Sequence, residues 1–180
     1  MATATQTRLM TFSEFSELSE PQGSRYELRH GELIILAPPT HEHFLIQRHL
    51  RRLLENAAQG AGEVEIEMAF QATSDYNYRI ADVAYISKER WAQIPLKGTM
   101  RGAPDLVIEV LSPSNTATEI LDKETLCLEN GSKEFWVVDV ERQQVKVSTP
   151  DGRTVTYKSG ATIPLFFGGS IQVVEIFTQA

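Results

Sequence analysis

The pattern of apolar and polar positions predicts alternating strands and helices along the 180-residue chain. Alternation with period two and β-branched runs predict strands, whereas an apolar stripe near the helical period predicts a helix. The predicted helices cover 11–18, 41–58 and 118–130, and the predicted strands cover 25–29, 32–37, 64–70, 78–86, 106–111, 133–139, 144–149, 153–157 and 171–174. This order predicts an α/β fold with a central mixed β-sheet flanked by helices and with additional β-hairpins.

Capping and turn residues support these boundaries. Thr11 and Glu14 have the spacing of a capping box, and Thr40 can cap the helix that follows it. Gly31 and Gly152 can supply the turns of the two hairpins. Local chemistry and periodicity therefore agree on most element ends.

The segment Leu106 to Leu111 is an almost unbroken apolar run, which is typical of a strand covered on both faces. Its one ionisable residue is Glu109, and a buried carboxylate is costly unless a cation or a hydrogen-bond donor compensates it. Asp105 stands at the start of the strand, about 13 Å from Glu109 at about 3.3 Å per residue. We therefore do not expect Asp105 and Glu109 to hold one ion together.

Asp82 repeats this anomaly inside the predicted strand 78–86. If the two strands are neighbours, the carboxylates of Asp82 and Glu109 can meet and hold Mg²⁺, which prefers one or two carboxylates and several waters. Such an ion could position and activate a water molecule for attack on a phosphodiester.

Composition narrows the class of protein. A net charge of −7 argues mildly against non-specific nucleic-acid binding, although it leaves room for a local basic cleft. One cysteine, Cys127, excludes an internal disulfide and a cysteine-only zinc site. No apolar run approaches the ~20 residues of a membrane span, and the N-terminus has no secretory pattern. We therefore expect a cytoplasmic protein with no membrane partner.

Several motifs together resemble the Uma2 family, also called DUF820, within the PD-(D/E)XK nuclease superfamily. The resemblance runs from Arg25 to Val145 and rests on Tyr26-Glu-Leu with Gly31-Glu, His43, Ala81-Asp-Val, Pro104-Asp-Leu-Val-Ile-Glu-Val-Leu-Ser-Pro-Ser, Lys123 before Gly131, and Glu134-Phe-Trp-Val-Val-Asp. It implies a single restriction-endonuclease-like domain over residues 9–180. From the sequence itself we expect residues 1–8 to be a disordered tail.

The resemblance also assigns catalytic residues. Asp82 corresponds to the first metal-binding aspartate, and Glu109 corresponds to the acid of the second motif. The lysine expected two residues after Glu109 is absent, because Leu111 stands there, and Lys123 on the following helix takes its place. Glu27 corresponds to an accessory glutamate. The implied activity is a Mg²⁺- or Mn²⁺-dependent endonuclease acting on DNA, and a homodimer would suit a duplex substrate.

Two further acids or bases of the motifs, Asp105 and His43, are accessory candidates whose roles stay open. Each candidate also has a simpler explanation. Glu109 could be a core acid paired with a base, Lys123 a solvated lysine, and Glu27 a solvent-facing strand residue. His43 could be a structural or surface residue, and Asp105 could be an acid that caps a turn or the start of the strand. The arginines of the predicted helix 41–58 are most simply a solvated face but could contact phosphates. The alternative function is an inactive nuclease-fold module that binds nucleic acid or a protein partner.

Overall fold

The computed structural model describes residues 8–18 and 25–178. Apart from Arg8, the predicted disordered tail lies outside the described residues. The described helices are α1 (Phe12–Ser16), α2 (His41–Ala58), α3 (Lys88–Trp91), α4 (Ala117–Glu129) and α5 (Val173–Phe177). None of these five helices combines the length and the apolar character that crossing a membrane requires.

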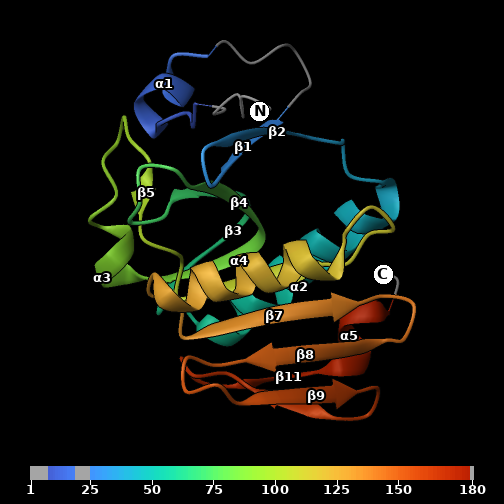
Figure 1. The fold of residues 1–180 in the computed structure, drawn as a ribbon. Helices are drawn as coiled ribbons and strands as arrows, with labels where there is room; N and C mark the ends of the chain where they lie inside the picture. Colours follow the sequence, from blue (N-terminus) through green and yellow to red (C-terminus); the bar gives the residue numbers. More distant parts are fainter. Residues whose placement is uncertain (1–7, 19–24, 179–180) are drawn as a thin grey trace.

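A mixed β-sheet forms the centre of the molecule (Figure 1). Its strands are β1 (Arg25–Arg29), β2 (Glu32–Leu36), β3 (Gly62–Gln71), β4 (Tyr78–Ser87), β5 (Met100–Arg101), β6 (Leu106–Val110), β7 (Glu134–Asp139), β8 (Gln144–Ser148) and β9 (Thr154–Lys158). The order is β2-β1-β4-β6-β7-β8-β9, with β3 paired to β4 and β5. The β6–β7 and β3–β5 pairs are parallel and the others are antiparallel. Strands β10 (Thr162–Pro164) and β11 (Ser170–Gln172) form a separate small sheet.

The helices cover opposite faces of the sheet, with α4 in front and α2 behind in Figure 1. Leu50 and Leu54 of α2 pack against Val83 on one face of the sheet, and the buried side chains of α5 join the same cluster. Cys127 and Ile120 of α4 pack against the other face. Glu109 stands between Ile108 and Val110, which pack on the α2 side of the sheet, so its side chain belongs to the face that α4 covers. Asp82 stands where the alternation breaks, because Val83 packs on the α2 side and Ala81 on the α4 side.

The predicted fold class is confirmed, and two of the predicted helix starts are reproduced in detail. Thr11 and Glu14 form the predicted capping box of α1, and Thr40 Oγ1 accepts the N–H of His43 at 3.2 Å at the start of α2. Both helices therefore begin where the sequence supplies side-chain acceptors for their first N–H groups.

The predicted strand 171–174 is wrong in its second half. The strand β11 ends at Gln172, and α5 begins at Val173. The N–H of Gln172 donates to Glu175 at 3.2 Å, which stabilises a helix start, and Val173 and Ile176 are both buried at helical spacing. Burial of these two side chains outweighs the β-propensity of the valines. The short strands β5 and β10 were not predicted.

Candidate active site

The strands β4 and β6 part at the point where the two anomalous acids stand. Their last recorded pair is Val83 with Ile108, and one further step in register would bring Asp82 opposite Glu109. Instead, the N–H of Asp82 donates to Glu109 Oε1 at 3.4 Å, and the N–H of Val110 donates to Asp82 Oδ2 at 2.8 Å. Each carboxylate thus satisfies an N–H that the sheet leaves free, and the structure brings the two predicted acids together in this fork.

Lys123 reaches the same place from α4. Its Nζ lies 2.8 Å from Glu109 Oε1 and 3.5 Å from Glu27 Oε1, and it donates to the carbonyl of Ile80 at 2.6 Å. Burial alone would lower the pKa of Lys123, but the carboxylates of Glu109 and Glu27 raise it above its ordinary value. Lys123 is therefore a fixed cation at neutral pH and not a solvated lysine.

Glu27 is a buried anchor on β1, so the solvent-facing alternative is wrong. It accepts the N–H of Ile80 at 2.9 Å and pairs with Arg29 at 2.7 Å and with Arg79 at 3.6 Å. Burial alone would raise the pKa of Glu27, but the surrounding cations, Lys123 foremost, lower it to about 2. Glu27 is consequently ionised at neutral pH, and its recorded side-chain partners are all cations.

The pKa of Glu109 is shifted in the opposite direction to that of Glu27. Burial raises its pKa to about 8; the charge of Lys123 opposes this shift and that of Asp82 adds to it. Among the described residues, no hydrogen-bond or ion-pair partner contacts its Oε2 atom. Glu109 therefore keeps one carboxylate oxygen available for a ligand.

The helix α2 contributes two side chains to Asp82. His43 Nε2 and Gln47 Nε2 each lie 3.2 Å from Asp82 Oδ1. The accessory candidate His43 thus contacts a predicted metal ligand. Gln47 was not predicted, because a glutamine inside an amphipathic helix carries no signal of its own.

Glu67 on β3 is a further acid that the sequence analysis missed. It stands across from Asp82 between the recorded pairs on either side, and its φ of 55° is left-handed, which is uncommon for a residue other than glycine. Gln47 donates to Glu67 Oε1 at 2.6 Å, and Arg25 forms an ion pair with Glu67. The amide of Gln47 therefore bridges two carboxylates and holds Asp82 in place.

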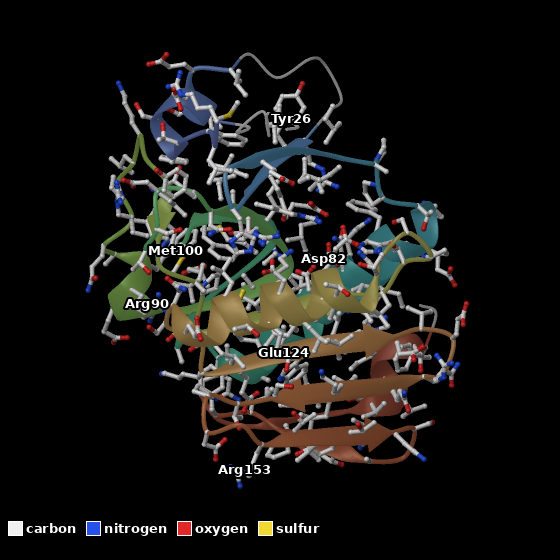
Figure 2. All side chains as sticks on the ribbon, viewed as in Figure 1. Tyr26, Asp82, Arg90, Met100, Glu124 and Arg153 are labelled. Atoms are coloured by element: carbon white, nitrogen blue, oxygen red, sulfur yellow. The ribbon has the colours of Figure 1, made fainter. Side chains whose placement is uncertain are left out.

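These groups line one pocket of about 330 Å³. Figure 2 shows Asp82 between the β1–β2 hairpin and α4. The segments 36–40 and 112–115 form part of the wall. The acids and bases that line the pocket are Arg25, Glu27, Arg29, His43, Glu67, Asp82, Glu109 and Lys123.

Asp105 does not line this pocket. Its buried carboxylate accepts the N–H of Ser87 at 2.9 Å and lies 3.4 Å from Arg90 and 3.6 Å from Lys133. These contacts tie the start of α3 to the entrance of β6. The contacts of Asp105 therefore stabilise the fold, and Asp105 lies outside the pocket that the other predicted site residues line.

The described residues include no group of three or more His, Cys, Asp or Glu side chains arranged to hold a metal ion. A metal at the fork would therefore depend on Asp82 and Glu109, with water completing its shell. That donor set of two carboxylates suits Mg²⁺ or Mn²⁺ better than zinc, which takes nitrogen and sulfur ligands in closed sites.

Comparison with protein families decides the relationship. The Uma2 family model, described as "Putative restriction endonuclease", matches residues 12–173. The chain belongs to the Uma2 family. Membership in Uma2 supports a nuclease, and it confirms the resemblance found in the sequence motifs.

A solved structure supports the fold of this Uma2 chain. It is a crystal structure described as a "putative nuclease belonging to DUF820" from Anabaena variabilis ATCC 29413. The two chains are 22% identical, with a TM-score of 0.81 over 93% of this chain and 97% of the other. No curated protein matches this chain.

Proposed function

We propose that this Uma2 protein is an endonuclease that hydrolyses DNA phosphodiester bonds with bound Mg²⁺ or Mn²⁺. The observation that carries the proposal is the meeting of Asp82 and Glu109 where β4 and β6 part, with Lys123 Nζ 2.8 Å from Glu109. Family membership supports the nuclease class. A cytoplasmic location and a homodimer stay predictions.

The residues present fit such an ion. Asp82 and Glu109 supply hard oxygen donors, Glu109 keeps one oxygen uncommitted, and the pocket of about 330 Å³ has room for water and a phosphate. When bound, the ion would lower the pKa of a water molecule and offset negative charge on the phosphate.

The remaining side chains have electrostatic and positioning roles. Lys123 is a cation at neutral pH, so it would stabilise charge that develops on the phosphate and would not act as a base. Glu27 and the Ile80 carbonyl hold its ammonium group. Gln47 and His43 fix one oxygen of Asp82, while the N–H of Val110 fixes the other.

One observation favours the alternative, a non-catalytic module that binds nucleic acid or a protein. Each of the three ammonium hydrogens of Lys123 has an oxygen partner in this chain, so the cluster is compensated without any ligand. Leu111 also occupies the position where the superfamily carries its lysine. The two functions differ in whether a metal binds and whether DNA is cut.

Calorimetric titration with Mn²⁺ tests the proposal. We expect the parent to bind Mn²⁺ in the millimolar range or tighter, and Asp82→Asn to bind at least about tenfold more weakly because it loses a charged ligand. Asp151→Asn, in the β8–β9 turn, is the matched control and should bind like the parent. Parent protein that nicks neither DNA nor RNA with either ion would favour the non-catalytic module.

The affinity for Mn²⁺ should depend on pH. Because the pKa of Glu109 is raised to about 8, its carboxyl holds a proton at neutral pH, and a metal ion must displace that proton. We expect the affinity to rise about tenfold per pH unit up to about pH 8 and then to level off. Titrations in two buffers of different ionisation enthalpy would count the released proton. An affinity independent of pH over this range would contradict a protonated Glu109.

A further inference from the structure

A second hollow, of about 640 Å³, lies along the outer side of α2, beside α5. We name it the α2 hollow and define it by Phe44, Arg48, Arg51, Arg52 and Phe177. Three arginines line it against one acid, Glu55, although the whole chain carries a net charge of −7. Arg51 also pairs with Glu65 at 3.4 Å, whereas Arg48 and Arg52 give the lining a net positive charge, opposite to that of the whole protein.

Two of these arginines form no ion pair with a carboxylate of the described residues. Eight of the eleven arginines in the sequence pair with a carboxylate in the described structure, Arg51 among them. Among the described residues, no carboxylate pairs with Arg48, Arg52 or Arg101. Arg48 and Arg52 are both exposed and lie about 6 Å apart along the helix axis, one turn from each other.

Nearby side chains hold both guanidinium groups in place. The guanidinium of Arg48 lies 5.8 Å from the centre of the Phe44 ring, which is 38% exposed. Arg52 Nη2 lies 3.0 Å from His49 Nε2. Burial and the charge of Arg52 lower the pKa of His49, so the imidazole is neutral near pH 7 and accepts this hydrogen bond. The α2 hollow thus presents two oriented cations beside an exposed aromatic ring.

The α2 hollow adjoins the candidate active site. His43 lines the site pocket and the next residue, Phe44, lines the hollow. On β3, Glu67 lines the site pocket and the preceding residue, Ile66, lines the hollow. A long ligand that extends from the site pocket into the α2 hollow would therefore reach Arg48 first and Arg52 one helical turn later.

We propose that the α2 hollow binds the sugar–phosphate backbone of the DNA strand that enters the site, which deepens the proposed function and rests on it. Arg48 and Arg52 contact separate phosphates, and Phe44 packs against a sugar or a base. Arginine is suited to phosphate contacts, and an aromatic ring beside a cationic groove is typical of surfaces that track a nucleic-acid strand. The charge of the α2 hollow complements a polyanion.

Fluorescence anisotropy with a labelled DNA duplex in EDTA, using the full chain, tests this inference. We expect the double variant Arg48→Gln/Arg52→Gln to bind at least about tenfold more weakly and to reduce the slope of log K against log salt by about 1.8. Phe44→Ala should weaken binding and leave that slope unchanged. Arg101→Gln/Arg153→Gln removes the same charge from other exposed positions, and its slope should equal that of the parent.

Binding and cleavage together separate this inference from the proposed function. Cleavage by the parent, with equal DNA affinity and slope in the two double variants, would overturn the inference alone. Salt-dependent binding that requires Arg48 and Arg52, without any cleavage, would support the inference and count against the endonuclease. A parent that binds no DNA at low salt would overturn the inference. So would a parent oligomer that only Arg48→Gln/Arg52→Gln dissociates, because the α2 hollow would then contact a second copy.

Discussion

Replacing Lys123 by glutamine is expected to reduce Mg²⁺-dependent nicking of plasmid DNA by about 10²–10³-fold. The Lys123 ammonium group is held beside Glu109 and stays charged at neutral pH, so its contribution to catalysis is a preorganised positive charge. Glutamine keeps a hydrogen-bond donor near the Ile80 carbonyl and removes that charge. Alanine is a poorer test, because it would also remove the donor to the Ile80 carbonyl and leave a cavity beside Glu109 and Glu27. The measurement is the rate of loss of supercoiled plasmid.

Lys133→Gln is the matched control. Lys133 is 58% exposed and lies 3.6 Å from Asp105, away from the site pocket, so this variant should cut like the parent. Thermal unfolding of each variant would show whether a lost activity reflects lost folding. Lys123→Arg, which keeps the charge, should fold if Lys123→Gln does not. A Lys123→Gln protein that folds and cuts at the parent rate would show that Lys123 does not replace the lysine missing at Leu111.

The sequence predicted most of the fold because its local signals agree with one another. The Thr11 and Thr40 caps place two helix starts where the structure has them, and the alternation of apolar positions places the strand ends to within about two residues. The two acids could be predicted for a related reason. A carboxylate in an apolar strand is costly wherever that strand lies in the sheet, so Asp82 and Glu109 indicate a compensating site before their partners are known.

The rest of the site depends on contacts that no local pattern carries. Glu67 is one of three alternating glutamates in β3, and only its position opposite Asp82 and its bond to Gln47 distinguish it. Conversely, Asp105 shares a continuous motif with Glu109, yet the extended strand separates the two carboxyl groups and Asp105 pairs with α3. Two acids that are close in sequence need not be close in space, because four residues of an extended strand span about 13 Å.

Glu27→Gln is expected to lower the free energy of unfolding by about 3–5 kcal/mol at neutral pH. Glu27 is 1% exposed and ionised, and it compensates Lys123, Arg29 and Arg79. Glutamine would remove the negative charge that compensates these three cations. At about 2–4 °C per kcal/mol for a chain of this size, the melting temperature should fall by roughly 10 °C. Glu89→Gln, on the exposed side of α3, should change it little.

The same contribution should disappear in acid. The pKa of Glu27 in the folded protein, about 2, lies below its ordinary value of 4.5, so its stabilising effect is present above about pH 4.5 and is lost as the pH falls toward 2. Denaturant titrations at about pH 7, 5 and 3 should therefore show a similar difference in stability between the parent and Glu27→Gln at pH 7 and 5, and less than about half of that difference at pH 3. A constant difference between them would contradict an ionised Glu27.

Mn²⁺ affinity of the folded Glu27→Gln protein separates an anchor from a metal ligand. The side-chain partners of Glu27 are cations, and we expect Lys123 to keep its contacts to Glu109 and to the Ile80 carbonyl when the charge of Glu27 is removed. Because Asp82 and Glu109 would still supply the carboxylates, we expect the affinity to change by less than about tenfold while stability falls. A variant as stable as the parent that no longer binds Mn²⁺ would instead make Glu27 a ligand. The accessory acid of this site would then act on the ion directly and not through the position of Lys123.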